Sequence, residues 1–310
     1  MKIESISIML PEENNDIEKW DLEEWRKKYP MDYFKAVAML YQSNNPSVTD
    51  VIFKILYKIT RLHVPDVLYK YYSLTDNVNL NKKKLTTLCN KQIYMSELRD
   101  FNDPFDGKGF FYDPNQLADI KRLEERGGRI IEDFTSFVKT TCFTVNGVNS
   151  MPMWAHYGNN HRGFCVSYNK KNNSKLFSCV YPVQYTDERL DITRLVRKQA
   201  IEICSKIDAN IKDGQKITVY NDRILMYVAL LMYNVKHISW SYENEFRCSL
   251  SSKDSYFTVK PSEIYIGMNC DEKNIKLLEE IADYLEIPIY RMKFKECDDS
   301  YQLCADIHKY

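Results

Sequence analysis

The sequence predicts an α+β fold, because segments with strand character and segments with helix character are interspersed without the regular alternation of a doubly wound sheet. At 310 residues the chain can bury most of its unfolded surface, so a stable core needs no disulfide or metal. Five apolar residues near the N-terminus recur at helical spacing: Ile52, Ile55, Leu56, Ile59 and Leu62. We therefore expect a helical annex over residues 1–65 and an α+β domain over residues 66–310.

The annex is expected to be helical throughout. Helices are predicted at residues 16–28 and 31–41, and a further helix begins at the capping box of residues 47–50, Ser-Val-Thr-Asp. Pro65 ends this part of the chain. The β-branched and aromatic residues of 67–72 then predict the first strand of the main domain.

In the main domain, the pattern of apolar and turn residues predicts strands and helices in mixed order. Strands are expected at residues 92–95, 140–143, 163–168, 178–185, 246–250, 263–266 and 289–294. Helices are expected at residues 83–89, 115–126, 129–138, 151–157, 192–207, 218–236 and 272–285.

Charge and cysteine content set limits on partners and location. The 43 basic and 43 acidic residues cancel, so a nucleic-acid partner would need a local basic patch. Nine cysteines without a CxxC pair indicate reduced thiols and a cytoplasmic protein, and they show no zinc-ligand spacing. The N-terminus lacks a signal-peptide run, and the longest apolar stretch, residues 224–235, is too short to span a bilayer.

The acidic segment 240–247, Trp-Ser-Tyr-Glu-Asn-Glu-Phe-Arg, is the strongest candidate for chemistry. If it is extended, the period-two rule places Glu243, Glu245 and Arg247 on one face. Two close carboxylates can separate their pKa values, so that one acts as a base and the other as an electrostatic stabiliser. The alternative is a solvated strand face on which Arg247 neutralises its neighbours.

An aromatic segment at residues 151–158 is the second candidate. On one helical turn Trp154 and Tyr157 lie three residues apart, so they could form a wall that stacks on a planar ring. Ordinary core packing explains the same spacing. His156 between them is more often structural or exposed than catalytic.

A turn-rich segment at residues 101–106, Phe-Asn-Asp-Pro-Phe-Asp, is the third candidate. Its Asn and Asp residues can bond to their own backbone amides and then need no ligand. Metal binding by Asp103 and Asp106 would require further oxygen ligands. We therefore assign no metal site from the sequence.

Several motifs in order resemble an uncharacterised bacterial domain family over about residues 66–295: Leu68-Tyr69-Lys70-Tyr71, Phe101-Asn102-Asp103-Pro104-Phe105-Asp106, Met153-Trp154-x-His156-Tyr157 and Trp240-x-Tyr242-Glu243-x-Glu245-x-Arg247. That family is remotely similar to the ADP-ribosyltransferase superfamily. The resemblance implies a split β-sheet with an NAD cleft, a first strand near Tyr69 to Tyr71, and a late strand that bears Glu-x-Glu.

By that resemblance, Glu245 holds the nicotinamide ribose and Glu243 assists the acceptor. Six residues would contact NAD, as substrate: Lys70, Tyr71, Trp154, His156, Tyr157 and Arg247. Many relatives have an arginine where this chain has Tyr72, so Lys70 would have to supply the phosphate contact.

Three functions follow as hypotheses. The first is a cytoplasmic NAD-dependent ADP-ribosyltransferase or NAD glycohydrolase in a bacterial toxin or anti-phage system, acting on an unidentified protein or nucleic acid. The second is a metal-dependent nuclease or hydrolase that uses Asp103, Asp106, Glu243 and Glu245. The third is a non-catalytic sensor that binds a partner protein through its N-terminal helices. None of the three requires a membrane.

Overall fold

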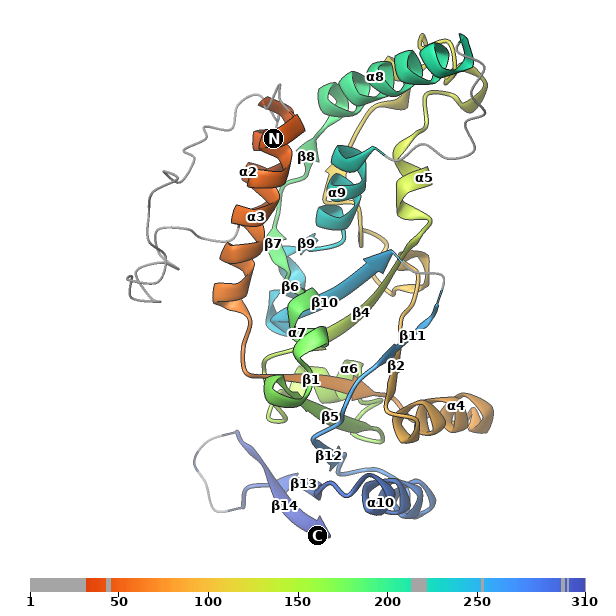
Figure 1. The fold of residues 1–310 in the computed structure, drawn as a ribbon. Coiled ribbons are helices and arrows are strands. Elements are labelled where there is room, and N and C mark those ends of the chain that lie inside the picture. Colours follow the sequence, from red (N-terminus) through yellow and green to blue (C-terminus); the bar gives the residue numbers. More distant parts are fainter. Residues whose placement is uncertain are drawn as a thin grey trace. The chain divides into compact units, whose positions relative to one another are not determined.

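The computed structural model describes residues 32–42, 46–212, 222–251, 254–296, 299 and 301–309. The chain is mixed α/β with one large mixed sheet, and it forms two compact units (Figure 1). Unit 1 combines the described residues up to His63 with Glu97–Val138 and Pro182–Ile238. Unit 2 combines Val64–Ser96, Lys139–Tyr181 and Ser239 onward. The chain therefore passes between the units several times.

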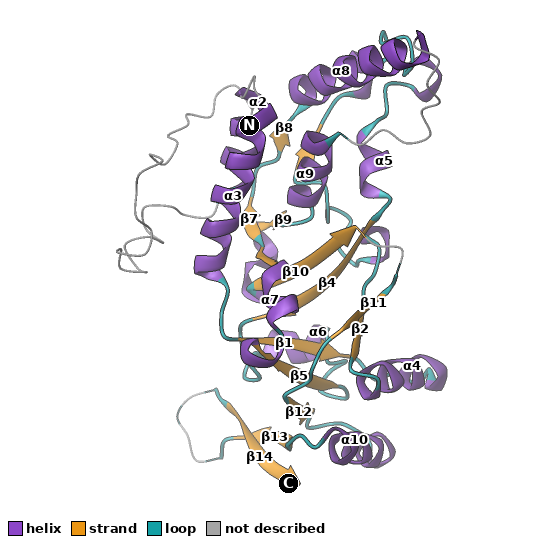
Figure 2. Ribbon diagram, viewed as in Figure 1, coloured by secondary structure: helices purple, strands orange, loops and turns teal. Residues whose placement is uncertain are grey.

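Unit 2 contains the large sheet, whose strand order is β14-β13-β12-β5-β1-β4-β10-β6 (Figure 2). β12 and β13 are parallel, whereas β1–β4, β1–β5, β12–β5 and β13–β14 are antiparallel. The strands are β1 (Val67–Tyr72), β4 (Val138–Thr144), β5 (Phe164–Asn169), β6 (Val180–Pro182), β10 (Glu245–Ser251), β12 (Glu263–Ile266), β13 (Ile289–Phe294) and β14 (Leu303–Lys309). A separate ribbon pairs β2 (Gln92–Tyr94) with β11 (Tyr256–Thr258).

The sheet is loosely joined between β1 and β4. β1 pairs with β5 at six successive positions, from Val67 opposite Asn169 to Tyr72 opposite Phe164. With β4 it pairs only at Tyr69 opposite Thr144. In Figure 2, β4 and β10 turn away from β1 and β5. The sheet therefore has two parts that diverge beside the C-terminal half of β1.

Helices cover the two faces of the sheet unequally. The larger apolar core joins β1, β5, β12 and β13 to α4 (Val78–Cys89), α7 (Ser174–Cys179) and α10 (Glu272–Leu285). The opposite face carries a smaller core with Tyr71, Cys165 and Tyr265, covered by α6 (Met151–His156). Each long helix begins at a side-chain cap: Asn77 accepts from the Leu80 amide at 3.0 Å, and Asp271 from the Asn274 amide at 2.8 Å.

Unit 1 is mainly helical around its own core. Its helices are α2 (Tyr33–Gln42), α3 (Pro46–His63), α5 (Ile131–Thr135), α8 (Thr193–Lys212) and α9 (Arg223–Met232). Two short parallel pairs join β3 (Phe110–Phe111) to β8 (Leu190–Asp191), and β7 (Gln184–Thr186) to β9 (Val235–His237). The side chain of Tyr33 is fully buried, and its hydroxyl donates to the Pro182 carbonyl at 2.6 Å. The N-terminal helices thus share a core with later segments.

Many predicted elements are confirmed, among them β1, β5, β12, β13, α8 and α10. The helix expected at residues 115–126 is instead two 3-10 turns, Pro114–Leu117 and Glu124–Arg126, which Gly127 and Gly128 follow at positive φ. The expected strand 178–185 is divided between the end of α7, β6 and β7. The strands β11 and β14 were not predicted. The helix expected at residues 16–28 lies outside the described residues.

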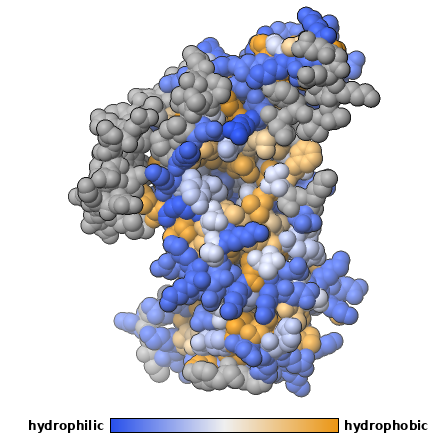
Figure 3. Space-filling model, viewed as in Figure 1, coloured by the Kyte–Doolittle hydropathy of each residue, from blue (hydrophilic) through white to orange (hydrophobic). Residues whose placement is uncertain are grey.

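The visible surface mixes hydrophilic and hydrophobic side chains (Figure 3), and the described cysteines are free. In Figure 3, hydrophilic side chains cover most of the visible face and hydrophobic atoms show between them. The eight cysteines that the structure describes are all unpaired. Across the described ranges, every helix is too short or too polar to cross a bilayer.

Candidate functional site

Strand β10 carries buried polar residues on one face and apolar residues on the other. Glu245, Arg247 and Ser249 alternate along the strand and are 5%, 0% and 8% exposed. Phe246 and Cys248 between them belong to the larger apolar core. The prediction that Glu245 and Arg247 share a face agrees with the structure. The alternative of a solvated strand face is wrong for these two residues, because both are buried.

Arg247 holds Glu245 with two parallel hydrogen bonds. Its Nε lies 2.7 Å from Oε1 of Glu245, and its Nη2 lies 2.9 Å from Oε2. This bidentate geometry fixes the carboxylate plane and satisfies both charges where water is excluded. The result is a carboxylate with a fixed direction inside the sheet.

Lys70 on β1 extends the charged network towards Glu245. Its Nζ donates to the Cys142 carbonyl at 3.0 Å. Burial lowers the pKa of Lys70, and the charge of Glu245 acts in the opposite direction. Burial raises the pKa of the Cys142 thiol well above its ordinary value, and Glu245 adds to this shift. Strands β1, β4 and β10 thus bring a base, a thiol and a carboxylate together.

Glu243 does not lie on the strand, which corrects the expectation that 243, 245 and 247 form one extended face. It ends the 3-10 helix Ile238–Glu243, and β10 begins only at Glu245. Asn244 between them has φ of 43°, a left-handed conformation that asparagine tolerates better than most residues. The Asn244 side chain donates to Asn146 at 2.6 Å, which helps to hold this bend.

Glu243 is nevertheless buried at 3% exposure, and it contacts the aromatic segment. The Tyr157 hydroxyl donates to its carboxylate in a short hydrogen bond. The Thr144 hydroxyl, at the end of β4, donates to the Glu243 backbone carbonyl at 2.5 Å. Two carboxylates therefore occupy the same part of unit 2, but the chain delivers them from a turn and from a strand.

Trp154 packs in the core and does not line an open site. Its side chain is fully buried, and its indole N–H donates to the Val148 carbonyl at 2.7 Å. Tyr71 packs edge-on against it with ring centroids 4.9 Å apart, and the Tyr71 hydroxyl donates to the Gly147 carbonyl at 2.7 Å. Of the predicted aromatic pair, only Tyr157 reaches the charged residues.

His156, at the end of α6, is exposed, and its ring lies 6.2 Å from the ring of Tyr242. It therefore sits outside the buried network. A buried polar pair on β4 and β10 was not predicted from the sequence: the hydroxyls of Thr140 and Ser249 are 2.8 Å apart between these strands. Only the pairing of the two strands brings these residues together.

Asp103 and Asp106 lie in unit 1. Asp103 accepts from the Phe105 amide at 2.9 Å, which is the self-capping turn that the sequence suggested. Asp106 is buried with its carboxylate 4.0 Å from Nζ of Lys236. Among the described residues, no three or more His, Cys, Asp or Glu side chains are arranged to hold a metal.

A protein-family model described as "Protein of unknown function (DUF2971)" matches residues 153–248. The matched stretch contains Trp154, Tyr157, Glu243, Glu245 and Arg247, but not the β1 motif. No curated protein and no solved structure matches the chain. A domain of an uncharacterised family is thus present, as the motifs predicted, and the similarity to ADP-ribosyltransferases stays a prediction.

Proposed function

We propose that unit 2 binds NAD and breaks its nicotinamide–ribose bond, transferring ADP-ribose to an acceptor or to water. The observation that carries this proposal is the Glu245 carboxylate, held in one orientation by fully buried Arg247, with Lys70 near it and a second buried carboxylate, Glu243, in the same unit.

Glu245 suits the stabilisation of positive charge on the ribose. As the bond from ribose C1′ to the nicotinamide nitrogen breaks, nicotinamide leaves with the electron pair and C1′ becomes oxocarbenium-like. A fixed carboxylate in a dry site stabilises such a state, as in glycosidases. Arg247 holds both carboxylate oxygens, so the negative charge faces the ribose in one fixed orientation.

Glu243 suits the acceptor step. Its carboxylate accepts a hydrogen bond from Tyr157, which orients it. When the nucleophile of the acceptor forms its bond to C1′, Glu243 can take the proton that this nucleophile loses. Because Glu243 and Glu245 are held by different partners, the two steps can depend on different residues.

Lys70 can bind the negatively charged phosphates of the substrate. An ammonium has three donors, and the Cys142 carbonyl occupies one of them. Tyr72, at the position where many relatives have arginine, is engaged elsewhere: its hydroxyl lies 3.1 Å from that of Tyr168, and its ring stacks on Phe164 at 4.8 Å. Lys70 is therefore the cation of β1 that we assign to the NAD phosphates.

The loose joint between β1 and β4 supports the same proposal. The resemblance implies a split sheet with its cleft beside the first strand, and β1 pairs with β4 at a single position. Lys70 and Tyr71 lie on this strand, while Cys142 and Glu245 come from the diverging part. The setting that we propose, a bacterial toxin or anti-phage system, rests on the resemblance alone.

The test is nicotinamide release from NAD, measured by chromatography with and without a bacterial lysate as the acceptor source. We expect Glu245→Gln to lower the rate by roughly 10²–10³-fold, the effect of losing one preorganised stabilising group. Glu243→Gln should reduce transfer to the lysate more than release of nicotinamide. Glu263→Gln is the matched control, because Glu263 accepts from Ser167 and Tyr265 in the same sheet.

Unfolding curves of each variant separate lost chemistry from lost structure. If the wild-type protein releases no nicotinamide and millimolar NAD leaves its melting temperature unchanged, the proposal is wrong, since a ligand that binds only the folded state must stabilise it. If Glu245→Gln and Glu263→Gln lose equal amounts of nicotinamide release, Glu245 has no specific role in the reaction.

A further inference from the structure

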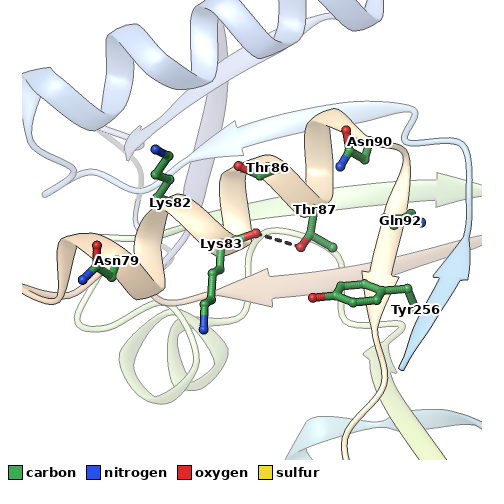
Figure 4. A pocket seen from close by; sticks show the side chains of 8 residues that line it. All are labelled: Asn79, Lys82, Lys83, Thr86, Thr87, Asn90, Gln92 and Tyr256. Carbon is green, nitrogen blue, oxygen red and sulfur yellow. Dashed lines mark hydrogen bonds between the residues drawn. The ribbon is translucent and has the colours of Figure 1, made fainter. Parts of the chain in front are cut away.

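A second feature of unit 2 is a pocket of about 600 Å³ beside α4 (Figure 4). Its volume falls in the range of about 300–1,000 Å³ that is typical of ligand sites. The lining residues that matter most are Lys82, Lys83, Thr86, Asn90, Gln92 and Tyr256. None of the eight residues that line it carries a carboxylate. The pocket is therefore positively charged and rich in hydrogen-bonding groups.

The charge of the pocket comes from α4. The lining residues of this helix recur at helical spacing, and in the view of Figure 4 Lys82 and Thr86 point to one side of the helix and Lys83 to the other. Both lysines are exposed, and neither forms an ion pair within the described part of the chain. Lys84 differs, because its Nζ donates to the Ser73 carbonyl at 2.6 Å and is already used.

The opposite side of the pocket is the outer face of the β2–β11 ribbon. Tyr94 and Tyr256 stand directly across from each other, with ring centroids 5.5 Å apart in an edge-on arrangement. They are 50% and 49% exposed. Ile93 and Phe257, the adjacent pair on the same two strands, belong to the apolar core. The ribbon thus presents two half-exposed tyrosine rings that are not part of the apolar core.

Each type of group in this pocket matches one part of a nucleic-acid strand. Lysines bind phosphates, aromatic rings stack on bases whatever their sequence, and amides such as those of Asn90 and Gln92 bond to base edges. A partner that carried only negative charge would make no use of the tyrosines. The chain has zero formal net charge, so attraction must come from a local patch like this one.

We propose that this pocket binds single-stranded nucleic acid, with Lys82 and Lys83 on the phosphates and Tyr256 stacked on a base. The binding requires neither Glu245 nor NAD. Either this proposal or the proposed NAD chemistry can therefore fail without the other, provided that binding is measured in the absence of NAD.

The experiment is fluorescence anisotropy with single-stranded DNA and RNA of about twelve nucleotides, within the usual range of site sizes. Wild-type protein should bind saturably, and affinity should fall as salt rises. In Lys82→Gln/Lys83→Gln the slope of log K against log salt should be shallower by about 1.4, since each phosphate contact to a single strand contributes about 0.7. Lys171→Gln/Lys276→Gln is the matched control: it neutralises two exposed lysines of the same unit.

Stacking is tested separately at Tyr256. Tyr256→Ala should weaken binding about 5- to 150-fold, the effect of about 1–3 kcal/mol for one stacked base, whereas Tyr256→Phe should retain most of it. Tyr284→Ala is the control, because Tyr284 is a 70% exposed tyrosine outside the pocket. No saturable binding by the wild type at low salt would overturn the proposal. Equal losses of affinity in the pocket variants and the control variants would also overturn it. A labelled polyglutamate that binds as tightly as nucleic acid, and equally well to Tyr256→Ala, would overturn it too.

Discussion

Removing Arg247 should destabilise the protein far more than removing an exposed arginine. Arg247→Met keeps the bulk of the side chain but leaves Glu245, which is 5% exposed, without the bonds at 2.7 and 2.9 Å. Breaking a buried pair by removing one partner typically costs about 3–5 kcal/mol, because the remaining charge is buried and uncompensated. We expect a loss of that size in the free energy of unfolding.

Urea denaturation of the wild-type protein and three variants measures this effect. The control Arg291→Met removes an arginine whose side chain is 40% exposed and lies 3.8 Å from Glu272, so it should cost less than about 1 kcal/mol. The double variant Glu245→Leu/Arg247→Met removes both charges and should regain most of the lost stability, since apolar replacements of buried pairs are often neutral or better. If the double variant is as unstable as Arg247→Met, the reasoning from an uncompensated charge is refuted.

Further predictions follow from other buried groups. Burial lowers the pKa of Lys70 from its ordinary value of 10.5. Just below pH 10.5 the unfolded chain therefore binds more protons than the folded protein, and stability rises with pH. Denaturation from about pH 7 upward should show the wild type gaining stability relative to Lys70→Met. Gly163→Ala should cost at least about 3 kcal/mol in unfolding experiments, because a Cβ there would overlap the carbonyl oxygen of Tyr72. The Cys165 thiol is fully buried with a raised pKa, so a thiol reagent should label half-buried Cys304 first, and equal rates would contradict the burial.

Local signals in the sequence predicted much of unit 2. The helix expected at 272–285 and the strand expected at 289–294 have the bounds of α10 and β13, because a cap, an apolar stripe and β-branched residues all agree there. β14 was missed because it is the edge strand of the sheet, and polar residues such as Asp306 and His308 hide its pattern. Its identity as a strand depends on pairing with β13, which no local rule contains.

The candidate site was predictable only in part, for a similar reason. The alternation of side chains along a strand correctly predicted that Glu245 and Arg247 share a face. The same rule was wrong for Glu243, because Asn244 has a left-handed backbone conformation that interrupts the extended chain. The expectation that Trp154 would line a site could not be distinguished from core packing, and the structure buries it fully. The approach of Lys70 to Glu245 depends on sheet order, which spacing along the chain does not reveal.

Stability alone does not explain why the sheet keeps a buried ion pair on β10. A buried ion pair repays at best the cost of removing two charges from water, and an apolar pair would hold β10 as well or better. Yet Glu245 and Arg247 lie where the sheet diverges beside β1, with Lys70 close enough for Glu245 to influence its pKa. A fixed carboxylate offers something that leucine cannot: a preorganised negative charge for a reacting group. If the double variant keeps full stability and loses nicotinamide release, the pair is retained for chemistry.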